Sequence, residues 1–370
     1  MPAATLMIKP VSGRCNMRCS YCFYADELQY RSAGQEPRRM SEAVLETAIR
    51  RVLRSAEGAA HFLFQGGEPT LAGLPFYESV LRFQKMYNTK GLRVTNAIQT
   101  NGLHLSAEMI AFLAREQFLT GVSLDGTALV HDSCRRDAAG KETYGAVLAN
   151  LDRLLEAGVE CNVLCVVTEV AARQAKEVFR TLAPYRFLQF IPCMDPLEGQ
   201  PGAYALTAEA YGRFLCETFD LYEKAWQQNR AVSVRTFDNW IHMLAGGQPD
   251  SCAMAGICGN ALMMESDGSL YPCDFYGTDE WLLGNIGEHS FLKILKSGKE
   301  TAFLEASHSV PSQCRDCPWY RLCRNGCRRE RDRQTGIHRH CEAHRMFFSY
   351  AYERMRRIGE NRSVPKYSGR

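Results

Sequence analysis

Short apolar runs alternate with amphipathic segments along residues 4–235 of the chain. The runs are short and bounded by polar or turn residues, which is typical of buried strands. They predict strands at 5–9, 61–65, 92–99, 119–124, 161–167 and 187–191. The segments between them repeat apolar residues at the period of a helix and predict helices at 41–56, 75–87, 106–115, 143–157 and 171–182. Ser41 is placed to cap its helix, and Gly158 follows the end of another.

Strands that alternate with helices at this spacing predict a parallel sheet with crossover helices. Six such units are fewer than the eight of a closed barrel. The expected fold class is therefore α/β, a partial (β/α)6 barrel of the TIM type.

The pattern changes near residue 250, where strand–helix alternation stops and cysteine, glycine and short polar links take over. A small domain with so little apolar periodicity needs bound metal to hold it together. Helical patterns at 207–226 and 237–244 precede this part, and another at 341–358 follows it. The expected division is a barrel at 1–235, a cysteine-rich domain at 236–345, and a C-terminal helix and tail at 346–370, disordered from 359.

The composition is that of an ordinary folded protein, with 46% hydrophobic and 23% charged residues among 370. A formal net charge of only +3 gives no reason to expect nucleic acid as a partner. No segment approaches the ~20 apolar residues of a membrane span, and the N-terminus lacks a secretory signal pattern. We expect a cytoplasmic protein without membrane or nucleic-acid partners.

Sixteen cysteines are unusual for such a chain, and they are unevenly placed. Three lie within residues 15–22 and eight within 252–341, while the others are scattered between. In a reducing cytoplasm, metal ligation or catalysis explains such clusters better than disulfides do.

The first group, Cys15, Cys19 and Cys22, directly follows the first predicted strand. Three closely spaced thiolates on a loop can bind three irons of a cubane cluster and leave the fourth iron open. A zinc site that lacks its fourth ligand is the alternative, although zinc usually takes paired Cys-x-x-Cys elements.

With Tyr21 before its last cysteine, this run resembles the motif of radical S-adenosylmethionine (SAM) enzymes. The segment Phe64-Gln-Gly-Gly-Glu-Pro-Thr70 ends the second predicted strand and resembles the family's GGEP motif. That resemblance implies a backbone contact with the methionine end of SAM, which adjacent glycines permit.

The second group resembles the SPASM extension of the same enzymes, which carries two auxiliary four-iron clusters. Its spacing is Cys258-x9-Gly268-x4-Cys273, then Cys314-x2-Cys317-x5-Cys323-x3-Cys327, then Cys341. The resemblance implies one cluster held by Cys252, Cys258, Cys273 and Cys327, and a second held by Cys314, Cys317, Cys323 and Cys341. A pair of zinc knuckles is the alternative.

Two further features near these cysteines carry ordinary interpretations. We expect His338, His340 and His344 to be solvated neighbours of Cys341, since eight cysteines already complete two clusters. The basic run 321–339 contains Glu330 and lacks interleaved aromatics, so it indicates a solvated face or a contact for an acidic partner.

Over nearly its whole length the chain resembles the anaerobic sulfatase-maturating enzymes. The segments that carry this resemblance are Cys22-Phe-Tyr24, Gln99-Thr-Asn-Gly102, Ser123-Leu-Asp-Gly126, Leu188-Gln-Phe-Ile191 and Tyr271-Pro-Cys-Asp-Phe-Tyr276. It implies three 4Fe-4S clusters and SAM as cofactors. It also implies oxidation of a cysteine or serine to formylglycine in an unfolded or nascent sulfatase with a Cys/Ser-x-Pro/Ala-x-Arg motif, and a flavodoxin- or ferredoxin-type electron donor.

The same resemblance assigns roles to single residues. Asp274, next to the cluster ligand Cys273, would be the base that takes the proton of the target side chain. Contacts with SAM would come from Tyr21, Gly67, Ser123, Arg135 and Met194, and contacts with the substrate peptide from Tyr24 and Gln65. An arginine suits the SAM carboxylate, and Met194 stands where the family has a leucine.

Two other functions remain open at this point. A radical SAM maturase of a ribosomal peptide precursor would share the cysteine motifs, although such enzymes often carry an N-terminal leader-binding domain and this chain reaches its first cysteine at residue 15. A non-catalytic iron–sulfur electron carrier would have no use for an open iron or for the Gly-Gly-Glu-Pro turn.

Overall fold

A computed structural model of the chain describes residues 3–32, 39–200, 202–230, 232–259 and 261–361. Its centre is a 10-stranded sheet in the order β10-β9-β8-β1-β2-β3-β4-β5-β6-β7. The strands are β1 Ala4–Ile8, β2 Ala59–Phe64, β3 Arg93–Thr100, β4 Leu119–Ser123, β5 Cys161–Val167, β6 Phe187–Pro192, β7 Ser233–Val234, β8 Ala261–Met264, β9 Ser269–Tyr271 and β10 Gly284–Asn285.

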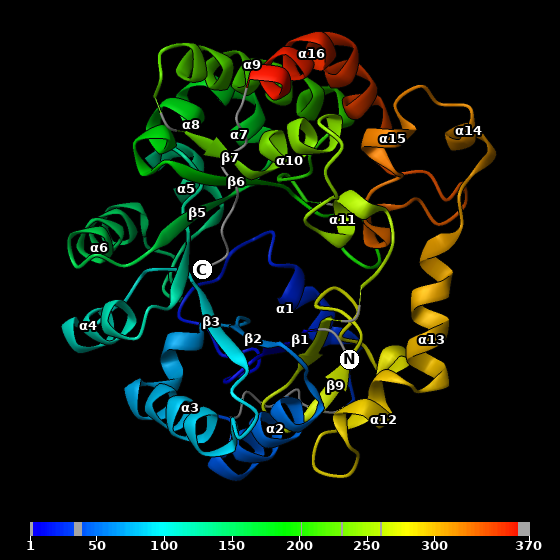
Figure 1. Cartoon of the computed structure of the whole chain (residues 1–370). Helices are drawn as coiled ribbons and strands as arrows, with labels where there is room; N and C mark the ends of the chain where they lie inside the picture. Colours follow the sequence, from blue (N-terminus) through cyan, green and yellow to red (C-terminus); the bar gives the residue numbers. More distant parts are fainter. Residues whose placement is uncertain (1–2, 33–38, 201, 231, 260, 362–370) are drawn as a thin grey trace.

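Strands β1 to β6 pair in sequence order, and every pair is parallel. All six expected strands are present with ends shifted by a few residues at most. Crossover helices cover the outer side of this curved sheet (Figure 1), as parallel strands require. They are α2 Glu42–Ser55, α3 Leu74–Tyr87, α4 Ala107–Arg115, α5 Ala128–Cys134, α6 Tyr144–Glu156, α7 Glu169–Arg173, α8 Ala175–Leu182 and α9 Ala208–Gln227.

Hydroxyl caps fix where several of these helices begin. Ser41 accepts a hydrogen bond from the Val44 amide at 3.3 Å, so α2 begins one residue later, as the sequence predicts. The single helix expected at 171–182 is wrong. The structure has two helices there, α7 and α8, because the chain leaves helical geometry at Gln174 (φ −119°, ψ 33°).

The sheet continues past the last crossover into the cysteine-rich part. Strand β8 pairs in parallel with β1, with Thr5 opposite Ala261, and β9 returns antiparallel to β8. The sequence pattern predicted neither these strands nor β7 and β10, since each spans four residues or fewer. Main-chain pairing therefore joins the barrel directly to the segment that carries Cys273 and Asp274.

The C-terminal part is built mainly from short helices with long connections (Figure 1). They are α10 Arg235–Leu244, α11 Cys252–Ala255, α12 Phe291–Leu295, α13 Gly298–Glu305, α14 Ser312–Arg315, α15 Tyr320–Cys323 and the long α16 Cys341–Asn361. Helix α16 packs on α9 and α10, with the Phe347 ring 5.6 Å from Phe219 and 5.5 Å from Phe237. Residues 359–361 are helical rather than a disordered tail, and 362–370 lie outside the described residues.

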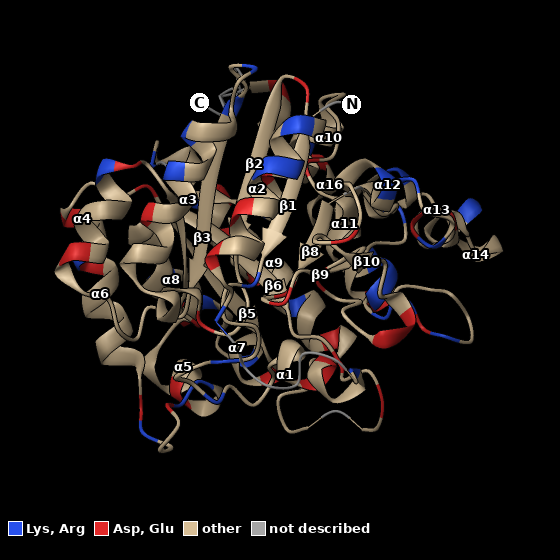
Figure 2. Cartoon of the chain, turned by 90° about the horizontal axis from the view of Figure 1, so that it is seen from below, with Lys and Arg blue, Asp and Glu red and all other residues tan. Residues whose placement is uncertain are grey.

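Charged residues of both signs are interspersed along the outer helices, as Figure 2 shows for α2 and α3. This distribution agrees with the small net charge of +3. In the part of the chain that the structure describes, no helix combines the length and the apolar character needed to cross a membrane.

Candidate active site

The residues expected to bind SAM and substrate come from loops at the carboxyl ends of the parallel strands. The cysteine loop follows β1, the two glycines follow β2, Asn101 follows β3, Ser123 ends β4, and Met194 follows β6. These ends meet at one edge of the sheet, where open and closed α/β sheets place their ligands. Ser123 is 6% exposed, and Met194 is half-buried.

Gly67 packs directly against the cysteine loop. Its φ is +54°, and a Cβ there would lie 2.3 Å from the carbonyl oxygen of Arg14 and 2.4 Å from that of Ser12. The next amide, of Glu68, donates to the Arg14 carbonyl at 2.9 Å. No side chain fits at this position, so the Gly-Gly turn fixes the loop that carries the three cysteines.

The Glu68 carboxylate is buried and accepts hydrogen bonds from residues that follow β2 and from residues at the end of β3. It accepts from the Thr70 amide at 3.0 Å, the Thr100 hydroxyl at 2.8 Å and the Asn101 amide at 2.7 Å. Burial raises the pKa of Glu68, and these donors oppose the rise. Asn101 in turn lies 3.6 Å from Cys15 Sγ. Neither Glu68 nor Asn101 was predicted as a site residue, although both lie in quoted motifs.

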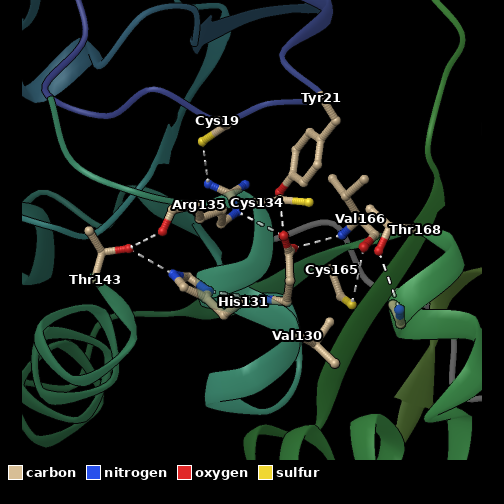
Figure 3. Close-up of polar contacts among 12 residues, drawn as sticks. Cys19, Tyr21, Val130, His131, Cys134, Arg135, Thr143, Cys165, Val166 and Thr168 are labelled. Atoms are coloured by element: carbon tan, nitrogen blue, oxygen red, sulfur yellow. Dashed lines mark hydrogen bonds and ion pairs between the residues drawn. The ribbon is translucent and has the colours of Figure 1, made fainter. Parts of the chain in front are cut away.

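Asp125 links two of the residues expected to contact SAM. Its Oδ2 lies 3.0 Å from Arg135 Nε and also accepts the Tyr21 hydroxyl. Arg135 Nη1 lies 3.7 Å from Cys19 Sγ, and Figure 3 shows Cys19 and Tyr21 on one loop pointing toward Arg135 of another segment. Burial raises the pKa of Cys19 to about 12 while Arg135 lowers it, so metal binding is what would hold this thiol as a thiolate.

A neutral histidine, His131, is hydrogen-bonded to Asp125 and, through Thr143, to Arg135 (Figure 3). The Asp125 amide donates to His131 Nδ1 at 3.3 Å, and His131 Nε2 lies 3.1 Å from the Thr143 hydroxyl, which donates to the Arg135 carbonyl at 2.8 Å. This chain of bonds requires the proton on Nε2. Burial lowers the pKa of His131 to about 4, which keeps the ring neutral. Asp125 and His131 were not predicted, although Asp125 lies in the Ser123–Gly126 motif.

Asp274 lies inside the protein between two partners that hold its two oxygens. Lys9 Nζ is 2.5 Å from Oδ1, and Gln65 Nε2 donates to Oδ2 at 2.6 Å. The Lys9 ammonium also lies 3.9 Å from the centre of the Tyr24 ring. The structure therefore brings together Asp274, Gln65 and Tyr24, three residues that the resemblance assigns to the site. It adds Lys9, which was not predicted from the sequence because nothing distinguishes a single lysine at the end of a strand.

A second layer of charge lies behind this group. Glu265 accepts the Tyr24 hydroxyl at 2.8 Å and the Ser12 hydroxyl at 2.6 Å, and it pairs with Arg31. Glu27 is 1% exposed, and its oxygens accept no hydrogen bond from any described residue, with Arg31 Nη2 3.7 Å away. Burial and the charge of Asp274 raise the pKa of Glu27 to about 8, so the carboxyl is protonated at neutral pH.

The eight C-terminal cysteines gather in two separate groups. Cys252 and Cys327 each raise the pKa of the buried Cys273 thiol, and Cys252 and Cys258 raise that of Cys327, after the larger effect of burial. In the other group, Cys341, Cys314 and Cys317 act in the same way on Cys323. The two ligand sets implied by the resemblance draw on these same neighbours and stay a prediction.

The second group lines a cavity of about 300 Å³. All four thiols, Cys314, Cys317, Cys323 and Cys341, face this space together with His344. Among the residues with described positions, no three His, Cys, Asp or Glu side chains are close enough to hold a single metal ion. Thiols spread around such a volume fit a polynuclear cluster better than one zinc ion.

Two of the three histidines near Cys341, His338 and His340, are buried rather than solvated as expected, and His344 is half-buried. His338 is 4% exposed and His340 is fully buried, with its ring 4.9 Å from that of Tyr211. The first turn of α16 and the residues just before it pack against aromatic side chains of α9 and α10. One of these side chains is Trp240, whose ring is 5.8 Å from that of His344. Long-range packing of this kind leaves no local pattern in the sequence.

Part of the basic run is solvated, as expected for Arg321 and Arg333, but several of its arginines also bind backbone carbonyls. Arg329 donates to Asp195 at 2.8 Å and Arg333 to Leu197 at 2.8 Å. Arg339 donates to the carbonyl oxygens of Cys193 and Leu206 at 3.3 and 3.0 Å. These hydrogen bonds connect the cysteine-rich part to the loop between β6 and α9, which carries Met194.

Comparison with known proteins agrees with this architecture. Residues 10–182 match the Radical SAM superfamily, and residues 256–318 match an iron-sulfur cluster-binding domain, SPASM. The chain is 38% identical to the cysteine-type anaerobic sulfatase-maturating enzyme of Clostridium perfringens (strain 13 / Type A), over 98% of this chain and 100% of that one. It is 29% identical to the serine-type enzyme of Bacteroides thetaiotaomicron, over 93% and 88%.

Solved structures give the same result. Native anSMEcpe with bound AdoMet and Cp18Cys peptide matches with a TM-score of 0.92 and 37% identity, over 98% of this chain and 99% of that one. Streptococcus suis SuiB bound to precursor peptide SuiA, at 14% identity and a TM-score of 0.64 over 90% and 74%, shares the fold.

The fold and the site thus define a radical SAM oxidoreductase with a partial (β/α) barrel and an added iron–sulfur domain, which uses SAM and four-iron clusters as cofactors. The chain belongs to the anaerobic sulfatase-maturating enzymes.

Proposed function

We propose that this protein oxidises a cysteine of an unfolded or nascent sulfatase to formylglycine. The observation that carries the proposal is the buried Asp274, held by Lys9 and Gln65 beside Tyr24. A carboxylate in this position can take the proton of a bound thiol. Relatives of the cysteine type are 38% and 39% identical to this chain, whereas relatives of the serine type are 29% and 30% identical, which favours cysteine over serine as the target.

We further propose the ligand sets. The open-iron cluster would be held by Cys15, Cys19 and Cys22, and the two auxiliary clusters by Cys252, Cys258, Cys273 and Cys327 and by Cys314, Cys317, Cys323 and Cys341. When bound, the open cluster and SAM supply the one-electron and hydrogen-abstraction chemistry that side chains cannot perform. The division we propose is the one predicted from the sequence, with a barrel at 1–235, a domain with the two auxiliary clusters at 236–345, and a C-terminal helix and tail at 346–370.

The chain's own residues then have distinct tasks. Lys9 pairs with one oxygen of the Asp274 carboxylate, and Gln65 orients the other. Tyr24, fixed by its bond to Glu265, forms the wall of the peptide site. The base at Asp274 accepts the target thiol's proton, and its neighbours keep water out of the site.

For SAM we propose contacts from Tyr21, Gly67, Ser123, Arg135 and Met194. The internal pair of Arg135 with Asp125 holds the guanidinium at the strand ends while leaving its outer edge for the carboxylate of SAM. The substrate motif Cys-x-Pro-x-Arg, a flavodoxin- or ferredoxin-type donor and a reducing cytoplasmic setting complete the proposal. The many free thiols of the chain support that setting.

A peptide assay tests the proposal. The protein is reconstituted anaerobically and given reductant, SAM and a peptide with Cys-x-Pro-x-Arg, and a matched peptide carries alanine in place of the cysteine. We expect a mass loss of about 18 Da from the cysteine peptide only, as sulfur is replaced by oxygen and two hydrogens leave, with one 5′-deoxyadenosine per event. Deoxyadenosine without any change in the cysteine peptide would refute the assigned substrate.

A further inference from the structure

His344 and His338 both line the cavity of the second cysteine group. The Nδ1 atom of His344 lies 3.4 Å from Cys323 Sγ, a distance typical of a hydrogen bond to sulfur. Helix α16 begins at Cys341, so His344 follows that proposed ligand by three positions and faces the same side of the helix. One helix thus carries both a proposed ligand and a possible donor to another.

The ring of His344 is held from several sides. It lies 4.9 Å from the His338 ring, 5.8 Å from that of Trp240 and 6.0 Å from that of Phe348. His338 has its own partners, with Nε2 3.4 Å from Glu330 and Nδ1 accepting the His340 amide at 3.0 Å. His344 therefore has little freedom to turn Nδ1 away from the sulfur.

The direction of the bond follows from the chemistry of the two atoms. A cluster-bound thiolate has no proton and can only accept, so Nδ1 must carry the hydrogen. The 3.4 Å contact with Cys323 therefore assigns an N–H to Nδ1 of His344.

We propose that His344 donates a hydrogen bond from Nδ1 to the Cys323 ligand of the second auxiliary cluster and thereby raises that cluster's reduction potential. Reduction adds negative charge to the cluster, and an N–H directed at a sulfur stabilises the more negative state. His344 is a positioning residue in this account, because it acts on the cluster through Cys323. The inference rests on the ligand set proposed above.

Redox titration of two variants tests the inference. His344→Leu removes the donor, whereas His344→Asn places an amide N–H near the former Nδ1. Both are measured in the full reconstituted chain with Cys15, Cys19 and Cys22 changed to alanine, so that only the auxiliary clusters respond. We expect His344→Leu to lower the ratio of reduced to oxidised cluster about tenfold for one auxiliary cluster at a fixed potential, equivalent to 59 mV for one electron. His344→Asn should restore most of it.

A measurement on the unaltered side chain guards against misfolded variants. Protein labelled with 15N-histidine, with the second auxiliary cluster reduced, should show a weak nitrogen hyperfine coupling that His344→Asn abolishes. An unshifted potential in His344→Leu, or a strong coupling that indicates direct iron ligation, would overturn the inference. Loss of the cluster's iron from both variants would do so as well. Neither readout uses the peptide, so failure of the sulfatase assignment would be seen separately.

Discussion

The Lys9 ammonium and the Asp274 carboxylate form an ion pair of 2.5 Å in which neither side chain is more than 7% exposed. Lys9 follows the first strand of the barrel, whereas Asp274 lies next to a cysteine of the C-terminal part. The pair therefore joins the two halves of the molecule at the proposed base. A buried charge of either kind is costly alone, so each side chain depends on the other.

Replacing Lys9 by methionine keeps the length of the side chain and removes its charge. We expect formylglycine production to fall at least tenfold, since the buried Asp274 carboxylate loses the cation that pairs with it and holds it in place. SAM should still bind, so the ratio of deoxyadenosine to aldehyde should rise. Lys176→Met, on the exposed side of α8, is the matched control and should change neither quantity. Equal losses of SAM binding and aldehyde in Lys9→Met would show a general structural role instead.

Glu27 provides a pH-dependent property of the resting protein. Its pKa is raised to about 8 in the folded chain from 4.5, so folding favours the protonated form. The stability that this preference contributes is fully present below pH 4.5 and is lost as the pH rises toward 8, by at most about 1.4 kcal/mol per pH unit. The infrared band of a protonated carboxyl should disappear as the pH passes 8, and Glu27→Gln should lack this change. A band already absent at pH 6 would contradict the assignment.

Arg339 tests the connection between the cysteine-rich part and the SAM site. Its guanidinium bonds two carbonyl oxygens and lies 3.1 Å from Asp195, so it fixes the loop that carries Met194. Arg339→Lys keeps the positive charge but loses the planar guanidinium group that donates to two carbonyl oxygens at once. We therefore expect SAM to bind several-fold more weakly. Arg321→Lys, at an exposed position of the same run, should leave the dissociation constant unchanged. Unchanged binding in both variants would separate the arginine run from the SAM site.

The three proposed ligand sets predict iron contents. Since each cluster holds four irons, reconstituted protein should contain about twelve per chain, and about eight after Cys15, Cys19 and Cys22 are changed to alanine. Alanine at Cys134, Cys161 or Cys193, buried thiols outside the sets, should not lower the count. Zinc in place of iron, or loss of more than one cluster from the first variant, would contradict the sets.

Local sequence patterns predicted most of the barrel because its strands are continuous apolar runs with long amphipathic helices between them. Strand β5 was predicted at its observed bounds, and β1 within one residue at each end. Strands β7 and β10 have two residues each and depend on their neighbours for pairing, so no local pattern could reveal them.

The site could be predicted only where its residues lie in motifs. The cysteines, Gly67, Gln65 and Asp274 were found in this way, and the structure brings Gln65 and Asp274 into contact. Lys9 and Glu27 were missed because a single charged residue after a strand or in a short helix is usually exposed. Their roles arise from burial beside Asp274, which only the folded chain creates.

The most direct test of this account is the product ratio of Asp274→Asn with a cysteine peptide deuterated at Cβ. We predict that deuterium still appears in 5′-deoxyadenosine while formylglycine falls about a hundredfold or more, because hydrogen abstraction does not need the carboxylate and loss of the thiol proton does. Formylglycine at the wild-type rate would contradict the account and show that the base lies elsewhere.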